Sequence, residues 1–77
     1  MERVEREIEI IYDHYADTVY RFCMYYLNDE EKAKDVIVEV FQKLYVFYHS
    51  VEPKWMLRYL LYETKTIINR NQEKTKQ

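Results

Sequence analysis

Glycine does not occur in this chain, and proline occurs once, at Pro53. The tight turns that join neighbouring β-strands depend on these two residues, above all on glycine where φ must be positive. A chain without such turns has to carry its hydrophobic side chains on helices. The sequence therefore predicts an all-α fold.

Three stretches carry apolar residues spaced by threes and fours, the pattern of one face of a helix. They predict helices over about residues 4–27, 29–48 and 53–71, followed by a polar tail or the start of a linker at about 72–77. The connections are short, so the apolar faces can be buried only against one another. We therefore expect one compact three-helix bundle over residues 1–71. The expected core faces are Val4, Ile8, Ile11, Tyr12, Tyr15, Val19, Phe22, Cys23 and Tyr26; Ala33, Val36, Ile37, Val40, Phe41, Leu44 and Phe47; and Met56, Leu57, Leu60, Leu61, Thr64, Ile67 and Ile68.

Several apolar residues fall outside these faces. Ile10, Tyr20, Met24 and Tyr25 lie off the stripe of the first helix, which indicates either a second covered side or an exposed apolar surface. Val38 and Val46 project among polar residues of the second helix. They are either isolated exposed side chains, which are common, or part of a partner surface.

Both ends of the second helix carry boundary signals. Asn28 and Asp29 are good N-cap residues, and Glu31 stands three positions after Asn28, as in a capping box. Pro53 fits an early position of the third helix, where its missing N–H costs no hydrogen bond.

Charge is divided unevenly along the chain. Residues 1–50 hold six Lys/Arg and eleven Asp/Glu (net −5), whereas residues 51–77 hold six and three (net +3), giving the overall −2. The outward face of the third helix combines the cations with three aromatic rings. Cations alternating with rings are suited to phosphates and exposed bases, so this face is predicted to bind nucleic acid. Its residues are Lys54, Trp55, Arg58, Tyr59, Tyr62, Lys65, Asn69 and Arg70.

The titratable residues offer little for catalysis. One cysteine, Cys23, and two histidines, His14 and His49, make neither an internal disulfide nor a set with metal-ligand spacing. His14 with Asp13 or Asp17 imitates an acid–base pair, but there is no glycine-rich phosphate loop and no triad, so a solvated histidine is expected. We predict no enzyme activity, metal, cofactor or small-molecule substrate. With no signal peptide or membrane-spanning segment, we also expect a cytoplasmic location.

The run from Ala33 to Tyr45, AKDVIVEVFQKLY, resembles the A-E-D-x-x-Q-E-V-F-x-x-x-W segment of bacterial sigma factors, in region 2 of the extracytoplasmic-function type. Upstream, IYDHY at 11–15 and VYRF at 19–22 are similar to the start of that region. Downstream, Trp55 and Met56, followed by Ile67 and Arg70, are similar to its last helix. The resemblance covers roughly residues 8–71 at matching spacing, with Val38 at the position usually held by Gln.

The resemblance implies a transcription-initiation module. Its second helix would dock on the clamp helices of core RNA polymerase, and its third would recognise and help to open the −10 element of promoter DNA. The polymerase-binding positions would then be Asp35, Val38, Glu39, Gln42 and Lys43.

Three alternatives remain open at this point. Trp55 is either a stacking residue or a core anchor at the start of its helix. The module either binds DNA or serves only as a sigma-like protein that engages an anti-sigma or regulatory partner. The chain is either an excised domain or a short natural protein, and the polar tail favours excision.

Overall fold

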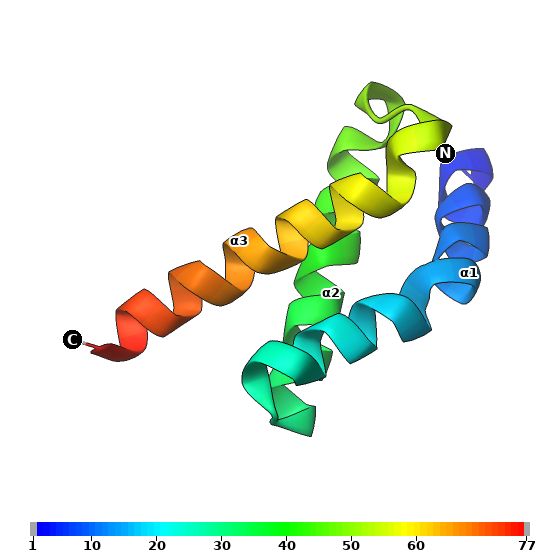
Figure 1. Cartoon of the computed structure of the whole chain (residues 1–77). Coiled ribbons are helices and arrows are strands. Elements are labelled where there is room, and N and C mark those ends of the chain that lie inside the picture. The colour runs from blue at the N-terminus through cyan, green and yellow to red at the C-terminus, as the bar shows by residue number, and fades with distance from the viewer. Residues whose placement is uncertain (1, 77) are drawn as a thin grey trace.

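The computed structural model describes the backbone of residues 2–76 and the side chains of residues 3–71. It contains α1 (Glu2–Leu27), α2 (Glu30–Phe47) and α3 (Met56–Lys76), with two short 3₁₀ turns, η1 (Tyr48–Ser50) and η2 (Pro53–Trp55), between α2 and α3. No strand occurs in this described part. The predicted all-α, three-helix architecture is confirmed (Figure 1).

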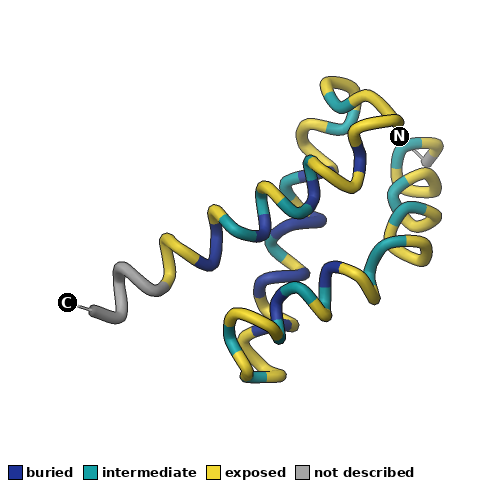
Figure 2. Tube along the Cα trace, in the orientation of Figure 1, coloured by how far each residue is buried: buried dark blue, intermediate teal, exposed yellow. Residues whose placement is uncertain are grey.

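The hydrophobic core lies where the three helices meet (Figure 2). The predicted face of α2 is correct for six of its seven residues; Phe47, at the end of the helix, is exposed. On α3, Met56, Leu60, Thr64, Ile67 and Ile68 are buried, Leu61 is half-buried and Leu57 is exposed. Thr64 satisfies its buried hydroxyl by donating to the carbonyl of Leu60 at 2.6 Å.

The prediction was less successful for α1. Only Val19 and Cys23 are fully buried, while Tyr12 and Tyr26 are exposed. The off-stripe residues divide between the two expected possibilities: Tyr20 and Met24 pack partly against the core, whereas Ile10 and Tyr25 are exposed. No residue from position 3 to 18 is fully buried. The predicted stripe therefore reaches the core only in the second half of α1.

The turn between α1 and α2 corrects the expected capping box. Asn28 adopts a left-handed conformation (φ 50°) and its N–H donates to the carbonyl of Met24 at 2.9 Å, so Asn28 ends α1. Asparagine tolerates this conformation better than most residues, which lets the chain reverse without glycine. Asp29 is the N-cap of α2, and its Oδ1 accepts from the backbone N–H of Lys32 at 3.0 Å.

The joint before α3 fixes the start of the predicted binding helix. Pro53 is the first residue of η2, and the N–H of Trp55 donates to the carbonyl of Glu52 at 2.9 Å. Residues 53–55 were expected to belong to the third helix itself but form this separate turn. At its other end, the backbone of α3 continues to Lys76, through most of the segment expected to be a polar tail.

Candidate nucleic-acid interface

Trp55 lies between two cations where η2 passes into α3. The Nζ of Lys54 lies 5.7 Å and the Cζ of Arg58 lies 4.9 Å from the centre of its ring, distances typical of cation–π contacts. The indole is 47% exposed. Trp55 is thus a surface residue held among positive charges rather than the core anchor that the sequence left as an alternative.

Further exposed residues continue this surface along α3. Tyr62 lies one turn beyond Arg58 and Asn69 two turns beyond Tyr62, and both are exposed. We call the set Lys54, Trp55, Arg58, Tyr62 and Asn69 the outer face of α3. It contains two cations, two aromatic rings and one amide, and at its edge a carboxylate oxygen of Glu52 lies 4.0 Å from the Nζ of Lys54.

Tyr59 does not share this exposure. Its ring packs against the core, and its hydroxyl is buried without a hydrogen-bond partner among the described residues. Burial raises the pKa of this hydroxyl, and the carboxylate of Glu63 raises it further. The position predicted for base stacking is therefore occupied by a partly buried ring.

Lys65 turns toward α1. Its Nζ lies 4.7 Å from the centre of the Tyr26 ring, which joins the predicted nucleic-acid helix to the end of the first helix. Sequence reasoning missed Tyr26 as a surface residue because its spacing fitted the core stripe. The neighbouring off-stripe Tyr25 was the only signal that aromatic surface lies here.

Part of the predicted polymerase surface forms a continuous exposed strip on α2. Asp35, Val38 and Gln42 are exposed, as are Tyr45 and Val46 on the following turn. We call these five residues the outer face of α2. Val38 and Val46, which the sequence left as either isolated or part of a surface, lie here about two turns apart.

The remaining predicted residues meet between α2 and α3. Glu39, predicted to face polymerase, is paired with Arg70, predicted to face DNA. The Nζ of Lys43 lies 3.3 Å from a carboxylate oxygen of Glu63, a residue that the sequence did not single out. Two of the residues assigned to polymerase therefore tie α2 to α3 instead of projecting from the outer face of α2.

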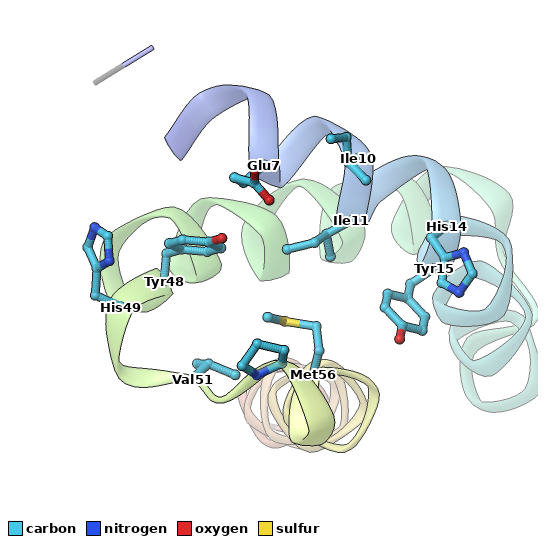
Figure 3. Close-up of a pocket in the computed structure, with 10 residues that line it drawn as sticks. Glu7, Ile10, Ile11, His14, Tyr15, Tyr48, His49, Val51 and Met56 are labelled. Carbon is cyan, nitrogen blue, oxygen red and sulfur yellow. The ribbon is translucent and has the colours of Figure 1, made fainter. Parts of the chain in front are cut away.

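A separate groove of about 410 Å³ lies between the first half of α1, η1 and the start of α3 (Figure 3). Ile11 and Met56 point into it, and His14 and His49 lie toward its two ends. Its lining is mainly apolar and aromatic, with Glu7 as the only carboxylate. Neither lysine nor arginine lines this groove, and it contains none of the predicted site residues.

Other chemistry is sparse in the described residues. No group of three or more His, Cys, Asp or Glu side chains among them is arranged to hold a metal ion. Asp17, suggested by sequence as a partner for His14, forms an ion pair with Arg21 at 3.1 Å. In the same part of the chain, no helix combines the length and apolar character needed to cross a membrane.

Comparison with known proteins places the chain in a family. The model of the family described as Sigma-70 region 2 matches residues 11–62, which include most of α1, all of α2 and the first part of α3. Neither the comparison with curated proteins nor that with solved structures gave a match. Because the family model covers more than half of the 77 residues, the chain belongs to the Sigma-70 region 2 family.

Proposed function

We propose that this domain binds the clamp helices of core RNA polymerase through the outer face of α2, and the single-stranded −10 element of a promoter through the outer face of α3. Membership of the Sigma-70 region 2 family implies a role in RNA polymerase binding and promoter melting. It is a domain of transcription initiation, not of a known catalytic family. The assignment of faces, the −10 element and the extracytoplasmic-function type are our proposals.

The observation that carries the DNA proposal is the half-exposed Trp55 between Lys54 and Arg58. Cations neutralise the phosphates of a strand, while aromatic rings stack on its unpaired bases. Stacking contributes about 1–3 kcal/mol per base, which is comparable with the few kcal/mol needed to unstack one step of a duplex. Trp55 and Tyr62 are therefore suited to hold a strand after it has melted.

The polymerase proposal rests on the mixed character of the outer face of α2. Asp35 and Gln42 offer polar contacts, and Val38, Tyr45 and Val46 offer apolar area that is exposed in the free domain. Val38 stands where the family usually has a glutamine. Burial of apolar surface contributes about 25 cal/mol per Å², so burial of Val38 against a partner can replace the hydrogen bonds that the glutamine would make.

Two binding experiments test the proposal. Fluorescence anisotropy at low salt should detect binding to a single-stranded non-template −10 oligonucleotide, and Arg58→Ala should weaken it. Lys34→Ala is the matched control, since it removes an exposed cation from α2 and should have little effect. A polymerase clamp-helix fragment should be retained by the domain and lost with Val38→Asp. If the parent domain bound neither the oligonucleotide nor the clamp-helix fragment, the proposal would be refuted.

A second function is favoured by the pairing of Arg70 with Glu39, which neutralises one predicted DNA-binding cation. In this case the domain would be a sigma-like interaction module that engages an anti-sigma or regulatory protein without touching DNA. Clamp-helix or regulator binding that persists in an Arg58→Ala, Lys65→Ala double variant, together with no DNA affinity in the parent, would identify this function.

A further inference from the structure

An aromatic cluster lies at the end of α1. The ring of Tyr26 lies 5.0 Å from that of Phe22 and 5.0 Å from that of Tyr25, the latter at an interplanar angle of 90°. Tyr25 is 82% exposed, more than any other large hydrophobic residue among the described side chains. Little of its ring is used in the fold, so most of the ring surface is available to a ligand.

Lys65 connects this cluster to α3. The ammonium group of Lys65 lies over the Tyr26 ring. On α3, Tyr62 of the outer face stands one helical turn before Lys65. Lys65 thus contacts a tyrosine of α1 and stands one helical turn after a tyrosine of α3. We call Tyr25, Tyr26, Tyr62 and Lys65 the tyrosine ledge.

We propose that the tyrosine ledge extends the single-stranded nucleic-acid site from α3 onto the end of α1, with Tyr25 stacking on an unpaired base. This inference rests on the proposed DNA-binding function and adds residues to it. Rings beside a cation match the stacking platforms and positive grooves of single-strand sites, which bind largely without sequence preference. A protein partner would more often be met by an apolar centre, whereas this ledge carries the ammonium group of Lys65 over one of its rings.

The chain offers closely matched variants for the test. Tyr25→Ala removes an exposed ring and should leave the unfolding midpoint unchanged, while Tyr25→Phe retains the ring. Phe47→Ala, at the end of α2 and outside both proposed binding faces, is the control for losing an exposed aromatic ring elsewhere. Affinity is measured by anisotropy with a labelled oligothymidylate of about 12 nucleotides, within the usual range of single-strand site sizes.

We expect Tyr25→Ala to weaken binding at least about fivefold, the lower end of the effect of losing one stacked base. Tyr25→Phe and Phe47→Ala should stay within about twofold of the parent domain, because the first keeps a stacking ring and the second removes a ring that lies outside the proposed site.

The alternative outcomes are distinguishable. If Arg58→Ala weakens binding but Tyr25→Ala does not, the extension onto α1 is wrong while the site on α3 stands. If the parent domain binds neither the oligothymidylate nor the −10 oligonucleotide at low salt, the proposed DNA-binding function itself is wrong; if it binds only the −10 oligonucleotide, the ledge is not a stacking platform without sequence preference and the extension is wrong. If Tyr25→Ala weakens only binding to the clamp-helix fragment, the ledge is a protein surface and the inference is overturned.

Discussion

Replacing Leu60 by alanine should test how α3 is anchored more sharply than any surface change. Leu60 is fully buried at the meeting point of the three helices, whereas Leu57, one turn earlier on the same helix, is 37% exposed. The sequence pattern placed both residues in the core. The two Leu→Ala changes remove the same atoms from the same helix, so any difference in cost reflects burial.

The expected costs follow from these positions. At Leu60 the change loses the transfer free energy of the side chain and leaves a cavity, for a total of about 3 kcal/mol within the usual range for buried leucine. At Leu57 part of the side chain already contacts water and no closed cavity forms, so about 1 kcal/mol is expected. A domain of this length should have a total unfolding free energy of roughly 4–12 kcal/mol, so Leu60→Ala removes a large fraction of it.

Urea denaturation followed by far-UV circular dichroism measures both costs. With a slope of about 1 kcal/mol per M, the unfolding midpoint should fall by about 3 M for Leu60→Ala and by about 1 M for Leu57→Ala. Equal shifts for the two variants, or a larger shift for Leu57→Ala, would refute this packing of α3.

Three further predictions follow from contacts elsewhere in the fold. Asp29→Ala removes the N-cap of α2 and should cost about 1 kcal/mol of unfolding free energy, while Asp29→Asn should retain most of the stability; equal losses in denaturant titrations would contradict the cap. Burial raises the pKa of the Cys23 thiol from 9.0 to about 11. At pH 9, iodoacetamide should therefore modify this thiol far faster in urea than in the native domain. The free energy of unfolding should fall as the pH rises from 9 toward 11, because the unfolded chain loses the thiol proton at lower pH than the folded one. A double-mutant cycle with Glu39→Gln and Arg70→Gln should give a coupling of about 0.5 kcal/mol, since this pair is partly exposed, and no coupling would mean that the pair does not hold in solution.

The sequence predicted the architecture and the core of α2 well because α1 and α3 both pack on a single face of α2. The apolar spacing of Ala33, Val36, Ile37, Val40, Phe41 and Leu44 was sufficient there. The same reasoning was only partly right for Tyr12 in α1, whose ring centre lies 5.0 Å from that of buried Phe41 although the residue is 45% exposed. Periodicity identifies a face of a helix but does not tell how completely a neighbour covers each turn of that face. The groove beside Ile11 and Met56 lies where α1 lacks that cover.

The candidate site was predictable in composition but not in its contacts. Trp55, Arg58 and Tyr62 were recognised from their place on one side of a helix, and they are exposed there. Glu39 and Arg70 were assigned to different partners because no local pattern reveals which edges of two helices face each other. Only the packing of α2 against α3 brings these charges together.

If the outer face of α3 holds single-stranded DNA, as we propose, the domain should prefer a single strand to a duplex. Anisotropy titrations at one low salt concentration should compare a −10 oligonucleotide alone with the same strand annealed to its complement, for the parent domain and for Trp55→Leu. We expect the parent to bind the single strand more tightly than the duplex. We expect Trp55→Leu to weaken single-strand binding by about fivefold or more and to leave the weak duplex binding nearly unchanged. Equal affinity of the parent domain for the two forms, or an unchanged single-strand affinity in Trp55→Leu, would contradict this proposal.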